Sequence, residues 1–322
     1  MKHLALALTL LAAPLAAPLA AQAPFWTSEW PDTDFGNTSV DFTEILSGGP
    51  GKDGIPALND PAYEAAATAA ITPQEAVLTV ELNGQARAYP IRYLMWHEIA
   101  NTEVGGVPLA VTYCPLCNSG IVFDRRLNGQ VLDFGVTGKL RYSDMVMFDR
   151  QTESWWQQFT GKGIVGDMNG AQLTQVISWM EPMGEFVARN PEGEVMARPD
   201  SPRSYGTNPY NGYDSAATPF LYRGENPPHG IPPLARVVRV GNRAWTLDRL
   251  QRNPEIVEEG VRIVWESGMA SPLDTARISA GRDIGSVRVY DAATGANILH
   301  EVVFAFAFHA FEPDGIWMLG PE

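Results

Sequence analysis

The order of apolar and polar residues predicts short strands joined by tight turns. Residues 76–81 read as a strand, Asn83-Gly84 is a strong hairpin-turn signal, and residues 86–91 return as a second strand. Apolar residues at helical spacing follow over residues 93–100, and another short helix is predicted over residues 182–190. The pattern therefore predicts β-hairpins interrupted by short helices.

More strands are predicted around the two cysteines of the chain. A second hairpin turn, Asn128-Gly129, lies among them. The predicted strands cover residues 109–113, 121–124, 131–136, 145–148 and 154–159.

Short matches recur in the same order in the second half of the chain. The segment that begins at Arg87 resembles the one that begins at Arg243, and Cys114-Pro115-Leu116-Cys117 falls against Ser271-Pro272-Leu273-Asp274 at nearly the same offset. A preserved order with drifting spacing is typical of an old duplication. We therefore expect a β-rich α+β fold in which two related units, the products of internal duplication, pack hairpins and short helices together.

These patterns divide the chain into five parts. The connecting segment carries eight prolines and several tyrosines, so we expect it to be ordered and to line the site. The expected parts are a signal peptide at 1–23, a loop-rich N-terminal wrap at 24–75, a first unit at 76–198 with the Cys-Pro-Leu-Cys loop, a Pro/Tyr-rich connecting segment at 199–233, and a second, degenerate unit at 234–322.

The N-terminus predicts export. Met1-Lys2-His3 is followed by an uncharged, mostly apolar run to Ala21, which is typical of a signal peptide. Pro14 and Pro18 interrupt the run, so a stable membrane anchor is disfavoured. No cysteine lies near the expected cleavage site to carry a lipid. We expect a periplasmic or secreted protein after signal-peptide cleavage.

Charge and length narrow the classes of partner. About 300 residues remain after cleavage, which is enough for a substantial hydrophobic core. The net charge of −14 makes nucleic acid and anionic membrane surfaces poor partners, because both are polyanions.

Cys114 and Cys117 are the only cysteines, and their spacing brings two sulfurs close together. Three interpretations stay open: a structural disulfide formed after export, a redox dithiol, and a site for a soft metal. A thioredoxin architecture is disfavoured, because the strand-like residues 121–123 follow the pair where that fold needs a helix.

A metal site would favour copper or zinc, since thiolates suit both ions and imidazole is acceptable to both. His97 is the first candidate for a third ligand, because its predicted helix lies just upstream of the strand that delivers Cys114. His309, within an aromatic segment, is a candidate fourth ligand. His229 lies among prolines and reads as a surface residue.

Four further residues are candidates for the site. Asp144 stands in an apolar strand, where a carboxylate needs a partner or a purpose. Asp149 and Arg150, with Thr152, are expected to close a turn through hydrogen bonds. Tyr113 directly precedes the first cysteine.

Several motifs together resemble the bacterial domain-of-unknown-function family numbered 3179, over most of the chain that follows the signal peptide. The resemblance implies an exported, uncharacterised protein and supplies no established reaction. In the family pattern Gly commonly follows the second cysteine, where this chain has Asn118. The motifs are Asp53-Gly54-Ile55-Pro56-Ala57, Trp96-His97-Glu98-Ile99, Gly105-Gly106-Val107-Pro108, Thr112-Tyr113-Cys114-Pro115-Leu116-Cys117, and Ser143-Asp144 through Asp149-Arg150-Gln151-Thr152-Glu153-Ser154.

Three function classes follow from these observations. The first is an exported protein that holds copper or zinc for metal handling or electron transfer, with a redox protein or a metal donor as its partner. The second is a thiol–disulfide redox enzyme that uses Cys114 and Cys117 as its catalytic pair. The third is a binding or scaffold module for a glycan or peptide, with a structural disulfide and a platform of aromatic side chains. The platform residues would be Trp26, Trp30, Trp155, Trp156, Tyr205, Tyr210 and Tyr213.

Overall fold

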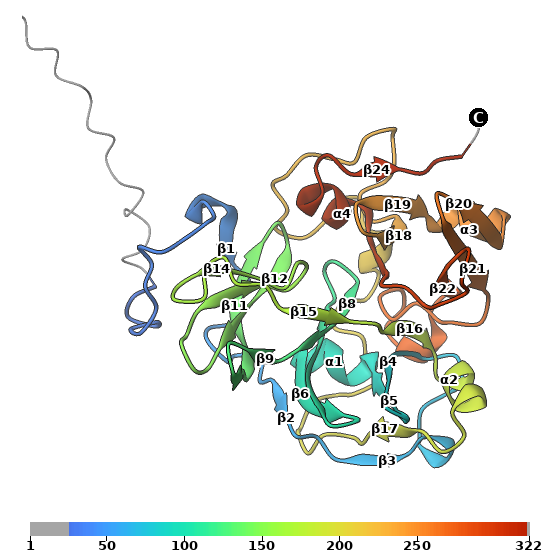
Figure 1. Cartoon of the computed structure of the whole chain (residues 1–322), viewed down its shortest axis with the longest axis horizontal. Coiled ribbons are helices and arrows are strands. Elements are labelled where there is room, and N and C mark those ends of the chain that lie inside the picture. Colours follow the sequence, from blue (N-terminus) through green and yellow to red (C-terminus); the bar gives the residue numbers. More distant parts are fainter. Residues whose placement is uncertain (1–25, 321–322) are drawn as a thin grey trace, which may run out of the picture.

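The computed structural model describes residues 26–320, which are built mainly from β-sheet (Figure 1). The predicted signal peptide, residues 1–23, lies outside the described residues. Within the described part of the chain, five sheets of three or more strands are arranged as the blades of a β-propeller, and one two-stranded sheet accompanies them. Among residues 26–320, no helix is long and apolar enough to cross a membrane.

Two five-stranded sheets carry most of the sequence motifs noted above. One has the order β1-β11-β12-β13-β14, and the other has the order β15-β8-β7-β6-β2. The first is composed of β1 (Ile45–Ser47), β11 (Phe134–Arg141), β12 (Asp144–Asp149), β13 (Trp155–Gln157) and β14 (Lys162–Val165). The second is composed of β15 (Thr174–Val176), β8 (Ser119–Asp124), β7 (Val107–Cys114), β6 (Ile99–Val104) and β2 (Leu58–Asn59).

Two other sheets share one strand arrangement. In β16-β4-β5-β17-β3 and in β23-β18-β19-β24, an antiparallel hairpin has an antiparallel strand on one side and a parallel strand on the other. Their strands are β16 (Trp179–Pro182), β4 (Ala76–Leu82), β5 (Gln85–Pro90), β17 (Glu194–Met196), β3 (Tyr63–Ala65), β23 (Glu301–Phe304), β18 (Arg236–Val240), β19 (Arg243–Thr246) and β24 (Ile316–Trp317).

The remaining elements are short. The last blade is β20-β21-β22, and β9 and β10 form the separate hairpin. These strands are β20 (Glu255–Glu258), β21 (Val261–Glu266), β22 (Ser286–Asp291), β9 (Arg126–Leu127) and β10 (Gln130–Val131). The α-helices of the described residues are α1 (Ile91–His97), α2 (Met183–Arg189), α3 (Leu247–Arg252) and α4 (Ala305–Phe311), and the 3₁₀ turns are Phe42–Glu44, Ala66–Thr68, Tyr213–Ser215 and Ile278–Ala280.

The expected α+β fold of two packed units is wrong. The helices are six or seven residues long and form no layer of their own. One hydrophobic core also runs through both expected units, since Leu78, Val122, Val238 and Phe304 belong to the same buried cluster. The unit that recurs in this structure is therefore the β-sheet blade, and the blades share one hydrophobic core.

A second, smaller core forms where the N-terminal segment packs on the sheet of β12. Trp30 and Trp155 are fully buried in it with their rings in edge contact, 5.4 Å apart between centroids. Trp156 is buried as well, against Phe134. These tryptophans stabilise the interior and do not form an exposed platform.

The segment 199–233, called the strap from here on, has little regular structure but many tethers. Tyr205 contacts His97, the hydroxyl of Tyr213 donates to the Leu116 carbonyl oxygen (3.1 Å), and the Ser143 hydroxyl donates to the Phe220 carbonyl oxygen. The strap thus lies against the loops that carry Cys114, Cys117 and Asp144.

Candidate metal centre

The Cys-Pro-Leu-Cys sequence forms the tip of the β7–β8 hairpin. Cys114 is the last residue of β7 and pairs with Ser119, the first residue of β8. The loop is packed against β23, because the Cys117 carbonyl oxygen accepts a hydrogen bond from the Phe304 amide (2.9 Å). Both cysteines are buried, with side chains at most 1% exposed, and they are free thiols.

Asn118 explains how the loop turns without the glycine of the family pattern. Its φ angle is +52°, in the left-handed region where Gly is favoured and Asn is the next most tolerated residue. The Asn118 amide also donates to the Val302 carbonyl oxygen (2.8 Å). The chain therefore has the backbone shape that Gly would allow, and an anchor that Gly could not provide.

Asp144 reaches the cysteines from a second hairpin. Tyr142 and Ser143 join β11 to β12 with φ angles of +51° and +66°, a two-residue turn that normally contains Asn or Gly. Asp144 follows as the first residue of β12 and is fully buried. Holding two ordinary residues at positive φ costs about 1–2 kcal/mol each, and such strain concentrates at functional sites.

The carboxylate of Asp144 is fixed mainly through one of its oxygens. Its Oδ2 accepts hydrogen bonds from the Gln157 side chain (2.6 Å) and from the Phe159 amide (2.9 Å). Its Oδ1 has a long contact with the Ser119 hydroxyl (3.5 Å), and the Cys114 and Cys117 thiols also interact with the carboxylate. One oxygen is thus held in place while the other has capacity for a further partner.

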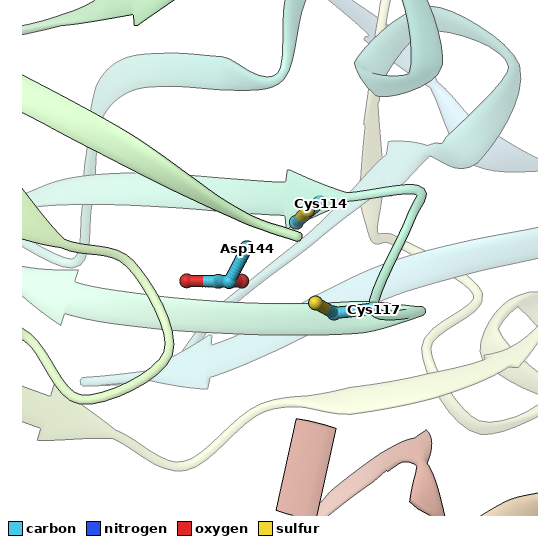
Figure 2. A group of neighbouring side chains, drawn as sticks. All are labelled: Cys114, Cys117 and Asp144. Atoms are coloured by element: carbon cyan, nitrogen blue, oxygen red, sulfur yellow. The ribbon is translucent and has the colours of Figure 1, made fainter. Parts of the chain in front are cut away.

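Cys114, Cys117 and Asp144 form a group in which one ligand atom of each lies within 4.8 Å of the others. Figure 2 shows the three side chains converging on one space, with the cysteines at the tip of the β7–β8 hairpin and Asp144 on the neighbouring chain segment. Among the described residues, none of the three makes an ion pair. The group is a buried set of acids without an internal cation.

Burial disfavours the charged form of every member of this group. It raises the pKa of the Cys114 thiol, raises that of the Cys117 thiol well above its usual range, and raises the pKa of Asp144 to about 6. Hydrogen bonds from Gln157 and Phe159 oppose the shift of Asp144 without cancelling it. A positive ion among the three groups would reverse this preference.

The two predicted histidine ligands lie elsewhere. His97 ends α1, and its ring nitrogens contact the Pro56 carbonyl oxygen (2.7 Å) and the Tyr205 hydroxyl (2.5 Å). His97 is not a member of the Cys114–Cys117–Asp144 group, and neither is His309, which lies on α4 with its ring 6.5 Å from that of Trp317.

The remaining candidates have structural partners. Asp149 accepts hydrogen bonds from the Thr152 amide (2.7 Å) and from the Trp156 indole (2.8 Å), which closes the expected turn. Arg150 makes a bidentate ion pair with Asp53 (2.7 and 2.8 Å). Tyr113 is fully buried, and its hydroxyl has no hydrogen-bond partner among the described residues.

A cavity of about 470 Å³ lies beside the group formed by Cys114, Cys117 and Asp144. Leu116 of the cysteine loop and Met145, the neighbour of Asp144, are part of its wall, and Tyr210, Tyr213 and Phe220 of the strap line it as well. Its size falls within the usual range for small-molecule sites.

Glu98, which the sequence analysis did not select, lines this cavity. Its φ angle is +60°, and its backbone is fixed by hydrogen bonds from its amide to the Leu94 carbonyl oxygen (2.6 Å) and from the Tyr113 amide to its own carbonyl oxygen (2.8 Å). Burial, with the nearby Asp144 charge, raises the pKa of Glu98 to about 8. Only its place beside His97 in the Trp-His-Glu-Ile motif could have drawn attention to it.

A loop in the last blade occupies the corresponding place between β21 and β22, and it contains Ser271-Pro272-Leu273-Asp274. Ser271 donates to Asp214 and accepts from Arg236 (2.9 Å), while Arg236 forms a buried ion pair with Asp214 (3.0 Å). Asp274 pairs with Arg282 (3.2 Å). Asp274 of this loop and the neighbouring Asp214 are therefore each paired with an arginine.

The structure thus defines a five-bladed β-propeller with a buried dithiol–carboxylate group at the tip of one hairpin. The family model described as "Protein of unknown function (DUF3179)" matches residues 52–315, and the chain belongs to that family, as its motifs indicated. No curated protein and no solved structure matches the chain.

Proposed function

We propose that the chain binds one zinc or copper ion through Cys114, Cys117 and Asp144. The observation that carries this proposal is the group itself: two sulfurs and a carboxylate oxygen within 4.8 Å of one another, buried, and without an ion pair among the described residues. Burying ionised groups is costly unless they are paired or coordinate a metal. A bound cation would provide the missing charge.

The donor set favours zinc. Zinc accepts thiolate and carboxylate ligands together, whereas Cu(I) prefers sulfur alone. Three protein ligands leave one position of a tetrahedral zinc ion open. With zinc the role is metal handling or Lewis-acid chemistry, and with copper it is metal handling or one-electron transfer, in the exported location that the N-terminus predicts.

Burial weakens the case for the thiol–disulfide enzyme. Attack on a disulfide needs an accessible thiolate of lowered pKa. Both thiols here are sealed from solvent and have raised pKa values. An aromatic platform is disfavoured in turn by the burial of Trp30, Trp155 and Trp156.

The test is metal analysis of the purified mature protein, prepared without oxygen and without added metal chelators. We expect about one zinc or copper ion per chain in the wild type. We expect loss of that ion in Cys114→Ser with Cys117→Ser, and weaker retention in Asp144→Asn.

The matched control is Asp274→Asn, which alters the corresponding loop of the last blade and should keep the ion. Metal retained by the double serine variant would refute the proposal. A wild-type protein that is metal-free as purified and does not take up Zn²⁺ or Cu⁺ on titration would also refute it.

A further inference from the structure

The cavity beside the cysteine loop contains one acid that the metal proposal does not use. Glu98 is 7% exposed, yet its carboxylate makes no hydrogen bond and no ion pair among the described residues. A buried polar group without a partner costs free energy, so such groups are normally satisfied. Since the side chain lines the cavity, a ligand in the cavity can supply the partner.

The local charge indicates what kind of ligand that is. The single basic residue in the cavity wall is Lys139, and its ammonium is already bonded to Glu29 (2.9 Å). Asp144 lies close enough to Glu98 for its charge to affect that carboxyl group. The cavity therefore combines a carboxyl group that has no cationic partner in the described part of the chain with a mostly apolar wall, and a bound cation would favour the ionised form of that group.

Aromatic side chains add a second feature that favours cations. Tyr210, Tyr213 and Phe220, all from the strap, line the same cavity. Aromatic faces attract cations, and quaternary ammonium groups are recognised by sets of aromatic rings. A hydrated metal ion would gain little from these rings, whereas an organic cation would use both the rings and the carboxylate.

We propose that this cavity binds a small organic cation, an amine or a quaternary ammonium compound, with Glu98 as its counter-ion and with Tyr210, Tyr213 and Phe220 around its apolar part. The site is distinct from the metal group, although the two share a wall at Leu116 and Met145. Binding of the cation does not require a metal ion.

Two soluble probes of nearly the same shape test the proposal. One is 3-hydroxyphenyltrimethylammonium, and the other is 3-tert-butylphenol, in which a neutral carbon replaces the charged nitrogen. In calorimetric titration at pH 8 of the purified chain we expect saturable binding of the ammonium probe and affinity about tenfold weaker or worse for the neutral probe. Equal affinities, or no binding of the ammonium probe, would overturn the proposal.

Variants separate this site from the metal centre. Glu98→Gln should weaken binding of the ammonium probe about tenfold and leave the neutral probe unchanged. Glu192→Gln removes the same charge from the exposed surface and should change neither affinity. Cys114→Ser with Cys117→Ser should lose the metal ion and keep the ammonium probe, so the two proposals fail independently.

An unchanged ammonium affinity in Glu98→Gln would contradict the role of that residue. Should this variant not fold, the ratio of the two probe affinities in the wild-type protein decides the matter alone.

Discussion

Two buried aspartates show how differently two corresponding loops are stabilised. Asp214, beside the Ser271–Asp274 loop, is held by Arg236 and Arg282, whose charges outweigh its burial and lower its pKa. Asp144, beside the Cys114–Cys117 loop, has no arginine, and burial raises its pKa to about 6. Both aspartates are buried, but Asp214 has two arginine partners, whereas Asp144 has none among the described residues.

The comparison shows which of the two loops has its charges balanced by residues of the same chain. The Ser271–Asp274 loop balances its charges with residues of the same chain and needs nothing from outside. The Cys114–Cys117 loop and Asp144 place three acidic groups together without a cation among the described residues, and we propose that a bound ion balances them. If the proposed ion binds, loops at similar places in two blades serve stability in one blade and binding in the other.

The largest effect is expected when the buried ion pair beside the Ser271–Asp274 loop is broken. Arg236→Leu leaves the buried Asp214 with only the half-exposed Arg282, and removal of one partner of a buried pair costs about 3–5 kcal/mol. Urea denaturation should show that loss in the free energy of unfolding. Replacing both residues with leucine should recover most of it. A small loss in the single variant would show that the pair is not important for stability.

The next largest effect is expected when a metal ion is added to the Cys114–Cys117 loop. A zinc ion at 100 times its Kd should raise the free energy of unfolding of the metal-free protein by about 2.7 kcal/mol, because it binds only the folded state. Thermal or urea denaturation with and without Zn²⁺ measures the shift. Cys114→Ser with Cys117→Ser should show none, and Asp274→Asn should show the wild-type shift. Equal stabilisation of the double serine variant would place the ion elsewhere.

The pH dependence of stability should have opposite signs for two buried acids, Glu98 and Asp214. The folded-state pKa of Glu98, about 8, lies above its ordinary value of 4.5, so its contribution to stability is lost as pH rises. Between pH 6 and pH 8 the metal-free protein should lose about 1.4 kcal/mol per pH unit, and Glu98→Gln should not. For Asp214, with its lowered pKa, the contribution is instead lost as pH falls. The same slope in Glu98→Gln would assign the effect to another group.

The smallest effect concerns backbone shape. Asn118→Ala should cost about 1–2 kcal/mol, because it loses the hydrogen bond to Val302 and places a less tolerant residue at positive φ. Asn118→Gly should change stability by about 0.5 kcal/mol or less, since relief of strain offsets the lost bond. Thr275→Ala, at the corresponding place after Asp274, is the control and should be nearly neutral. Equal losses in Asn118→Ala and Asn118→Gly would show that only the hydrogen bond is important.

Local features of this fold could be predicted from the sequence. Asn83-Gly84 does join β4 to β5, and the predicted helices at 93–100 and 182–190 overlap α1 and α2, although residues 99 and 100 belong to β6. Turn residues and apolar spacing act over a few residues, so they can be recognised without knowledge of the rest of the chain. The arrangement into blades could not be predicted, because it depends on long-range strand pairs such as β1 with β11 and β17 with β5.

The candidate site shows the same limit. The cysteine pair and Asp144 could be selected because their residue types are unusual where they occur. His97 was placed next to the cysteines from its position in the chain, whereas its ring contacts Pro56 and Tyr205, 41 and 108 residues away. Glu98 was missed, because its role depends on a positive φ angle and on a cavity that the strap completes.

The strap also affects the order of events during folding. Tyr213 contacts Leu116 across 97 residues, and Phe220 contacts Ser143 across 77, so both tethers close long loops of the chain. Contacts this distant in sequence form late in folding. A chain whose strap has not docked therefore leaves the cysteine loop uncovered, and the folded chain encloses it. If the proposed ion binds, its entry is easiest before the strap docks, and its release afterwards requires the strap to open.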